Sequence, residues 1–214
     1  MITVFYSSFP GHIPDDIWQS YLQLLPLETQ QKLLRYHFWK DRYAGLYGQH
    51  LLLQAFLECG LSKQDFFKIK RTYYGRPYLN DDIDFNISHS GNHVVCAISH
   101  HNSLGIDIEA IRSIEYQDFN SFMSNEEWIN IQNSPDSLRT FFEYWTKKES
   151  IIKADGRGLS APLANLTWIN KTTALLDKKQ WFLNPLPIAD GYSCYAASDS
   201  PEQNIKIIRK TITE

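Results

Sequence analysis

The chain has few cysteines and no long apolar run, and these two scarcities exclude several classes of protein. Its three cysteines, Cys59, Cys96 and Cys194, are odd in number, far apart and set in apolar surroundings. This spacing is typical neither of a zinc site nor of a disulfide framework, so we expect reduced residues in the core. No apolar run approaches the roughly 18 to 20 residues of a membrane span, and residues 1–17 lack the layout of a signal peptide. The sequence therefore predicts a cytoplasmic protein with no membrane partner.

An excess of either charge is lacking as well. The net charge is -3, which gives no reason to expect a nucleic-acid partner. Any anion-binding site must therefore come from local clustering of Lys and Arg. With 43% hydrophobic and 21% charged residues, the composition is that of an ordinary globular protein. A length of 214 residues suits one sizeable domain or two small halves that share a core.

The most informative stretch is residues 141–156, FFEYWTKKESIIKADG. Its apolar residues recur at three- and four-residue intervals, a pattern typical of an amphipathic helix. Positions three and four apart share a helix face, so Trp145, Glu149 and Lys153 lie along one side, with Lys148 at its edge. The pattern predicts a carboxylate held between two ammonium groups. By itself it fits a solvated Glu–Lys pair on a surface helix equally well.

Upstream, the segment 103–109, SLGIDIE, alternates apolar and polar residues and predicts a strand. Asp107 and Glu109 then point to the same face. Neighbouring carboxylates repel each other unless a cation lies between them, and their hard oxygen atoms suit Mg²⁺. Alone, this pair also fits a solvent-facing edge of a sheet. Its combination with the W-x-x-K-E-x-x-x-K pattern downstream is specific.

Together, the segments 105–109 (GIDIE) and 145–153 (WTKKESIIK) resemble the signature of the surfactin-synthetase-activating (Sfp-type) 4'-phosphopantetheinyl transferases. Segments 74–77 (YGRP) and 85–91 (FNISHSG) and the region 35–42 fit the same family at the expected places. The resemblance covers nearly the whole chain. It implies an α+β fold in which two similar halves form an intramolecular pseudo-dimer.

An internal repeat also indicates two halves. Residues 43–55 line up with 142–154, and residues 93–99 line up with 192–198, both at an offset of 99 positions. One helix and one strand that share a shift indicate two similarly built units. His50 is then the counterpart of Glu149.

We therefore predict two structural halves with a ligand cleft between them. The N-terminal half, 1–103, lies on the coenzyme A 3'-phosphate side, and the C-terminal half, 104–214, carries the metal and catalytic side. The chain is expected to be a monomer, because its second half supplies what a partner subunit would.

The resemblance implies a reaction as well. The 4'-phosphopantetheine arm of coenzyme A is transferred to a serine hydroxyl of an acyl or peptidyl carrier protein, with release of 3',5'-ADP. Phosphoryl transfer to an alcohol needs charge neutralisation, in-line positioning and a route for the serine proton. Asp107, Glu109 and Glu149 are expected to hold one Mg²⁺, with Mn²⁺ as the alternative metal. Glu149 is also the favoured general base, acting directly or through a metal-bound water, and the sequence does not separate its two roles.

The co-substrate, coenzyme A, carries several negative charges, and the resemblance assigns cations to them. Lys153 is expected to reach the pyrophosphate as a point charge and to take part in catalysis. Ser88 and His89 are expected at the 3'-phosphate, the histidine when protonated. Arg76 stands where some relatives carry lysine, and its guanidinium can clasp a phosphate bidentately. Lys32 matches a family position near the 3'-phosphate.

The chain departs from the family pattern on the first helices. Thr29 and Gln30 are neutral where some members are basic, and Ala44 and Gly45 replace a polar or basic pair. Arg42 is the candidate substitute for the missing cation.

Several roles stay open at this level. Lys148 fits a site cation or a structural ion-pair partner, and Glu127 matches a family carboxylate but also suits the start of a helix. Phe119, Phe122 and Met123 fit either a docking patch for an acidic carrier or the core.

Two other functions fit the same motifs. A non-catalytic module would bind the carrier or coenzyme A, although retention of all three acidic residues argues against it. A metal-dependent hydrolase would cleave the coenzyme A pyrophosphate with water and would need no carrier surface.

Local patterns predict the remaining elements. Helices are expected at 17–25, 28–40 and 41–58, a short capped turn at 62–65 and a capped helix from Ser124. Strands are expected at 2–6, 67–72, 85–88, 93–99, 167–169, 180–183, 192–197 and 205–212.

Overall fold

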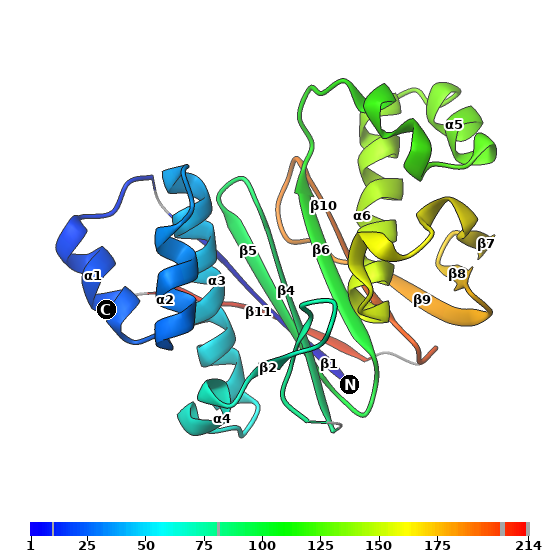
Figure 1. Ribbon diagram of the computed structural model, residues 1–214. Coiled ribbons are helices and arrows are strands. Elements are labelled where there is room, and N and C mark those ends of the chain that lie inside the picture. Colours follow the sequence, from blue (N-terminus) through cyan, green and yellow to red (C-terminus); the bar gives the residue numbers. More distant parts are fainter. Residues whose placement is uncertain (10, 81, 202–203, 213–214) are drawn as a thin grey trace.

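The computed structural model describes residues 1–9, 11–80, 82–201 and 204–212. The helices are α1 (Asp15–Gln23), α2 (Leu27–Leu34), α3 (Trp39–Glu58), α4 (Lys63–Phe67), α5 (Asn125–Gln132) and α6 (Ser137–Asp155), with short 3-10 turns at Tyr116–Phe122, Gly158–Ser160 and Leu163–Asn165. The strands are β1 (Ile2–Ser8), β2 (Lys70–Arg71), β3 (Pro77–Tyr78), β4 (Ile83–Ser90), β5 (His93–His100), β6 (Leu104–Ala110), β7 (Thr167–Asn170), β8 (Thr173–Leu176), β9 (Lys179–Pro185), β10 (Tyr192–Ser198) and β11 (Ile205–Arg209). Figure 1 shows α3 on one side of the molecule and α6 on the other, with β4, β5 and β6 between them.

Two sheets carry the fold, and they repeat one arrangement. The first has the order β11-β1-β5-β4 and the second the order β6-β10-β9-β8-β7. The antiparallel run β1-β5-β4 in one sheet therefore corresponds to β6-β10-β9 in the other. The predicted α+β fold with two similar halves is confirmed. The boundary between 103 and 104 stays a prediction, and β11, which follows that boundary, pairs in parallel with β1.

A long helix packs on each sheet because one stripe of each helix is apolar. Helix α3 buries Leu46, Leu51 and Phe56 against β4 and β5, and α6 buries Ile151 and Ile152 on the second sheet. The internal repeat of the sequence predicted this correspondence. Its two helical segments lie in α3 and α6, and its two strand segments are β5 and β10.

A seam of side-chain hydrogen bonds joins the two halves along β4 and β6. These strands lie side by side but belong to different sheets. Backbone N–H groups of β6 donate to polar side chains that alternate along β4, and the donors and acceptors are Leu104 to Asp84 (2.7 Å), Ile106 to Asn86 (3.0 Å) and Ala110 to Ser90 (3.0 Å). Side chains of β4 thus take the place that backbone carbonyls hold within a sheet.

Helix α6 packs unusually close to β6 at Gly105. A Cβ atom on this residue would overlap the Ser150 carbonyl oxygen and the Ala154 amide nitrogen. Only a residue without a side chain allows the helix to lie this near to the strand. The close approach brings the polar face of α6 over the carboxylates of β6.

The structure corrects two predicted elements between residues 28 and 72. The helix predicted at 28–40 ends at Leu34, because short-range bonds such as Tyr36 N–H to the Leu33 carbonyl close its last turn. The strand predicted at 67–72 is wrong over its first part. Ser62 and Asp65 form a capping box that starts α4, so Phe67 ends a helix and only β2 is extended.

The other local predictions agree with the structure in most places. The capping box of Ser124 and Glu127 starts α5 as expected, while β8 was not predicted. The three cysteines are free, with Cys96 and Cys194 buried, as predicted. In the part of the chain that the structure describes, no helix combines the length and the apolarity that crossing a membrane requires.

We predict that Gly105→Ala lowers the free energy of unfolding by roughly 1 to 3 kcal/mol or more, because α6 must move off β6 to make room for the methyl group. Gly11→Ala is the matched control, since a Cβ there meets no atom within 4 Å. Urea unfolding of both variants measures the difference. Equal stability of the two variants would contradict the close helix–strand contact.

Candidate active site

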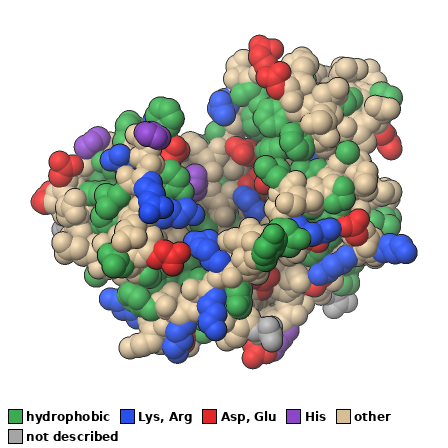
Figure 2. Space-filling view, viewed as in Figure 1, with side chains coloured by type: hydrophobic (Ala, Val, Ile, Leu, Met, Phe, Trp, Pro, Cys, Tyr) green, Lys and Arg blue, Asp and Glu red, His purple; other side chains and the backbone are tan. Residues whose placement is uncertain are grey.

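The chemistry-bearing residues singled out in the sequence converge where the two halves meet. Strand β4 contributes Ser88, strand β6 contributes Asp107 and Glu109, and helix α6 contributes Glu149 and Lys153. Figure 2 shows a hollow between the two lobes in which acidic and basic side chains come together. The seam between β4 and β6 forms the floor of this region.

Asp107 is the centre of the site. Its Oδ1 atom lies 2.5 Å from the Lys153 ammonium and 2.7 Å from the Ser88 hydroxyl, and it accepts a hydrogen bond from each. Lys153 also donates to the Ser88 oxygen at 2.9 Å. The Asp107 residue is only 3% exposed. Its second oxygen, Oδ2, is buried and has no hydrogen-bond partner among the described residues.

Two further carboxylates lie near Asp107. Glu109 accepts a hydrogen bond from the Ser90 hydroxyl at 2.8 Å, and burial followed by the charge of Asp107 raises the pKa of Glu109. Burial and then the charge of Asp107 raise the pKa of Glu149 to about 7. Glu109 adds to this effect, so the three carboxylates repel one another.

The expected metal triad is not assembled in this structure. Among the described residues, no three His, Cys, Asp or Glu side chains stand at distances that would hold a metal ion. The donor set nevertheless fits Mg²⁺, because Asp107 presents a buried oxygen without a partner and its neighbours are repelling carboxylates. The assignment of Asp107, Glu109 and Glu149 to one metal stays a prediction.

Two residues expected near the 3'-phosphate differ in their surroundings. Ser88 is buried and engaged with Asp107, whereas His89 is exposed on the next position of β4. Desolvation and then the Lys153 ammonium lower the pKa of His89, so the imidazole is mostly neutral at pH 7 without a ligand. Asp41 and Lys32 also act on His89, which puts these side chains on one wall of the hollow.

Arg76 clasps a carboxylate where the sequence suggested a phosphate. Its Nη1 and Nη2 atoms donate to the two oxygens of Asp84 at 2.8 and 2.9 Å. Its Nε donates to the Lys153 carbonyl at 2.7 Å and Nη2 donates to the Leu104 carbonyl at 2.7 Å. Four of the five N–H donors of the guanidinium are thus used within the protein. The phosphate contact expected of Arg76 stays a prediction.

Lys148 is a structural ion-pair partner, and the predicted arrangement of two ammonium groups around Glu149 is wrong. The Lys148 side chain is fully buried and donates to Glu127 at 2.6 Å and to the Phe122 carbonyl at 2.7 Å. Glu127 also accepts from the Trp168 indole at 2.6 Å. Adjacent helix positions point about 100° apart, so Lys148 faces the core while Glu149 faces the hollow.

The aromatic residues before α5 belong largely to the core. Met123 is buried, and the ring of Phe119 lies 4.8 Å from the ring of Trp145. Phe122 lies 5.7 Å from the same ring. Of the two alternatives left open by the sequence, packing explains these residues.

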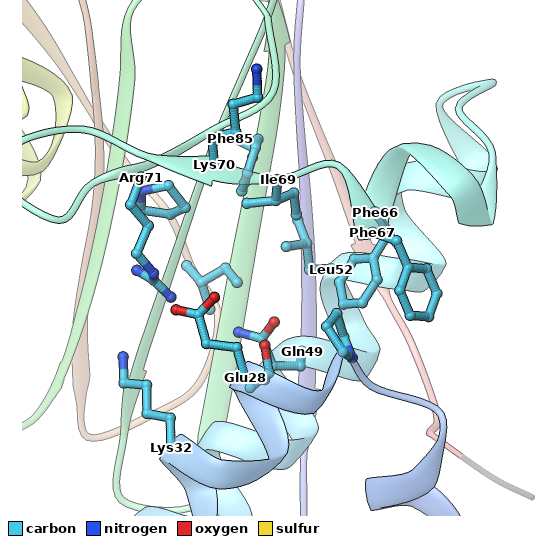
Figure 3. Close-up of a pocket in the computed structure, with 14 residues that line it drawn as sticks. Glu28, Lys32, Gln49, Leu52, Phe66, Phe67, Ile69, Lys70, Arg71 and Phe85 are labelled. Carbon is cyan, nitrogen blue, oxygen red and sulfur yellow. The ribbon is translucent and has the colours of Figure 1, made fainter.

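A pocket beside the hollow contains basic residues that sequence reasoning missed. It has a volume of about 260 Å³ and lies between α2, α3 and the hairpin of β2 and β3. Figure 3 shows the side chains of Glu28, Lys32 and Arg71 pointing toward one another on one side of it. Partial burial and then the charge of Arg71 lower the pKa of Lys32, as expected for two cations held close together. Lys70 lines the same pocket.

We predict that Lys148→Met lowers the free energy of unfolding by about 3 to 5 kcal/mol, because it leaves the Glu127 carboxylate buried without its cation. Adding Glu127→Gln should restore part of the loss. Urea unfolding checks both, with the exposed Lys171→Met as a control that should change stability by less than about 0.5 kcal/mol. An unaffected Lys148→Met variant would show that the pair does not bear on stability.

We predict that Glu149→Gln stabilises the metal-free protein in a pH-dependent manner. The pKa of Glu149 is about 7 when folded against an ordinary 4.5, so its protonated form favours folding at low pH and this contribution is lost as the pH rises through 7. The variant should exceed the wild type by roughly 1 to 3 kcal/mol at about pH 8 and by much less at about pH 5. Urea unfolding with a chelator present measures this, and the exposed Glu126→Gln should show no such trend. A gain that is equal at both pH values would contradict the raised pKa.

Comparison with known proteins agrees with this geometry. The family model described as the 4'-phosphopantetheinyl transferase superfamily matches residues 103–195, and the model described as 4'-phosphopantetheinyl transferase, N-terminal, matches residues 14–101. The chain is 34% identical to the 4'-phosphopantetheinyl transferase gsp of Aneurinibacillus migulanus over 100% of this chain and 93% of that protein.

Two more distant relatives extend the comparison. The chain is 31% identical to the 4'-phosphopantetheinyl transferase Sfp of Bacillus subtilis (strain 168), over 68% of this chain and 66% of that protein. It is 32% identical to the L-aminoadipate-semialdehyde dehydrogenase-phosphopantetheinyl transferase of Schizosaccharomyces pombe, over 81% of this chain and 76% of that protein. The full-length similarity and the two matched halves show that this chain belongs to the 4'-phosphopantetheinyl transferases, enzymes that use coenzyme A as their substrate.

Proposed function

We propose that this enzyme transfers the 4'-phosphopantetheine arm of coenzyme A to a serine hydroxyl of an acyl or peptidyl carrier protein, in a Mg²⁺-dependent reaction that releases 3',5'-ADP. One observation carries the proposal. A buried carboxylate, Asp107, is held by Lys153 and Ser88 and leaves one oxygen without a partner beside Glu109 and Glu149. Such a site combines anionic ligands for a metal with a cation for a phosphate.

The three carboxylates would hold the metal. Asp107 offers its Oδ2 atom, and Glu109 and Glu149 offer the side chains whose repulsion a divalent cation would relieve. Mg²⁺, or Mn²⁺ in its place, neutralises charge on the pyrophosphate when it is bound. The other requirements of the reaction fall to the residues of the chain.

Glu149 is the proposed base. With a pKa of about 7 in the metal-free protein, its carboxylate is well matched to accept a proton near neutral pH. The serine oxygen of the carrier attacks the phosphorus of the pantetheine phosphate, and the serine proton passes to Glu149. The bond from that phosphorus to the bridging oxygen breaks, and 3',5'-ADP leaves with the electron pair.

Lys153 is proposed to contact the pyrophosphate as a point charge. Its ammonium group is only partly buried, so one side of it faces the hollow while it holds Asp107. An ammonium between a carboxylate and a phosphate stabilises both, and it keeps the Asp107 side chain in place. Its position one helical turn from Glu149 aligns the proposed base and the proposed phosphate contact.

The nucleotide end of coenzyme A is proposed to lie against the N-terminal half. His89 and Lys32 share that wall, and a bound phosphate would favour the protonated form of His89. The pocket with Lys32, Lys70 and Arg71 adds two cations from β2 (Figure 3). These cations offset the neutral residues Thr29 and Gln30, which stand where some relatives are basic.

The remaining features follow from the same proposal. The enzyme acts as a cytoplasmic monomer, because the two halves of one chain together form the hollow. Its halves are divided near residue 103, with the nucleotide side before and the metal side after that point. The carrier approaches the open side of the hollow with its serine.

The proposal predicts a mass gain on the carrier. Incubating the enzyme with coenzyme A, Mg²⁺ and an unmodified carrier should add one phosphopantetheine arm, detected by mass spectrometry. Glu149→Ala should slow the transfer by about 100-fold or more, because it loses both a metal ligand and the base. Glu143→Ala on the same helix is the matched control and should transfer at the wild-type rate.

Each alternative function gives a different result in the same assay. Formation of 3',5'-ADP at an equal rate without the carrier would overturn the proposal in favour of hydrolysis. Binding of coenzyme A with no change in the mass of the carrier would indicate a module without activity. Removal of Mg²⁺ with a chelator should stop the transfer, and unchanged transfer in its absence would refute the metal assignment.

A further inference from the structure

Arg76 joins three elements of the protein at the end of the helix that carries Glu149 and Lys153. It follows the hairpin turn before β3, and its guanidinium contacts β4 through Asp84, β6 through the Leu104 carbonyl and α6 through the Lys153 carbonyl. The side chain is 14% exposed, and that of Asp84 is 19% exposed. This is the geometry of an anchored fork and differs from a cation held open for a ligand.

Asp84 is fully engaged on its side of the pair. Its two oxygens receive the two parallel bonds from Arg76, and Oδ2 also accepts the Leu104 amide at 2.7 Å. Oδ1 accepts the Phe85 amide at 2.9 Å. A phosphate that drew Arg76 away would leave this largely buried carboxylate without its cation, which is strongly unfavourable.

The contact with Lys153 satisfies a backbone group that the helix itself leaves free. The last carbonyls of an α-helix have no partner within the helix, and α6 ends at Asp155. Gly156 follows in the left-handed conformation with φ 91° and donates to the Ile152 carbonyl. The Lys153 carbonyl is the next acceptor, and the Arg76 Nε–H supplies its donor from the other half of the chain.

The stem of Arg76 also fits the end of the helix. A Cβ atom on Gly156 would lie 3.0 Å from the Arg76 Cδ atom, so the arginine side chain crosses directly over this glycine. A cation at this position also interacts favourably with the negative end of the helix dipole. Charge, hydrogen bond and packing therefore act together at one point of α6.

We propose that Arg76 is a positioning residue: with Asp84 it caps α6 across the two halves and so holds Lys153 on Asp107. This inference uses the function proposed above only for the part that Lys153 plays in transfer, since the cap itself rests on geometry alone. It gives Arg76 a role different from the phosphate contact expected from the sequence. Loss of the cap frees the last turn of α6, and the Lys153 ammonium then leaves its productive place.

Steady-state kinetics of Arg76→Gln, Asp84→Asn and the double variant test the inference. We expect each single variant to lower kcat by about 10- to 100-fold, because small displacements of reacting groups have effects of this size. The KM for coenzyme A should stay within about threefold of the wild type. The double variant should be no worse than the poorer single variant, since both remove the same contact. Arg139→Gln, an exposed arginine at the far end of α6, is the control and should keep the wild-type kcat.

Arg76→Lys separates the two roles most sharply. A lysine retains the positive charge that a phosphate needs, but it cannot make two parallel bonds to Asp84 and reach the Lys153 carbonyl as well. Positioning therefore predicts a reduced kcat for Arg76→Lys, whereas a phosphate ligand predicts near-normal kinetics. The inference is overturned if Arg76→Gln raises the KM for coenzyme A at least about tenfold with kcat intact while Asp84→Asn behaves as the wild type.

A binding measurement keeps the test independent of the transfer reaction. Calorimetric titration with 3',5'-ADP should give dissociation constants within about threefold of the wild type for Arg76→Lys and Asp84→Asn. A loss of affinity confined to the Arg76 variants would refute the cap. If the wild type fails to modify any carrier, the proposed function falls, whereas the titration still decides the role of Arg76.

Discussion

The contact between β4 and β6 is the constraint on which the rest of the structure depends. Two sheets with unsatisfied edges would each expose a row of backbone N–H and carbonyl groups. Here the edge of β6 is satisfied by side chains of β4, and Asp84, Asn86 and Ser90 accept its amides. Because the acceptors are side chains, the halves sit farther apart than two strands in a sheet, and the space beside the seam becomes the active-site hollow (Figure 2).

The seam also fixes the electrostatics of the site. Asp107 and Glu109 alternate with buried positions of β6, so their direction follows from the register that the seam sets. Gly105 then lets α6 approach until Glu149 and Lys153 reach the same space. Three carboxylates and one ammonium group result, and the excess of negative charge explains why the pKa of Glu149 is raised to about 7. An excess of this kind suits a cation that arrives with the substrate.

The sequence predicted the elements and failed on some directions. Periodicity located α3, α6, β5 and β10, because a buried stripe or face leaves a regular pattern of apolar residues. It misplaced Lys148, since the edge of a helix face is defined only by what packs against it, and Glu127 is far away in sequence. It missed the role of Asp84, although polar residues at every second position from 84 to 90 are a period-two signal. Arg76 was placed correctly, but whether a guanidinium meets a carboxylate or a phosphate depends on three-dimensional neighbours.

The two halves are alike in fold and different in chemistry, and one pair of residues shows how. His50 stands in α3 where the repeat puts Glu149 in α6. The imidazole of His50 is 7% exposed, its Nε2 atom lies 2.9 Å from the Tyr21 carbonyl, and burial lowers its pKa. Helix α1, which supplies Tyr21, covers this position in the first half, whereas Glu149 is left facing the hollow. The first half therefore uses the position for its core and lends its polar groups to the seam. A single site per chain follows, with the acceptors on β4 from one half and the carboxylates of β6 and α6 from the other.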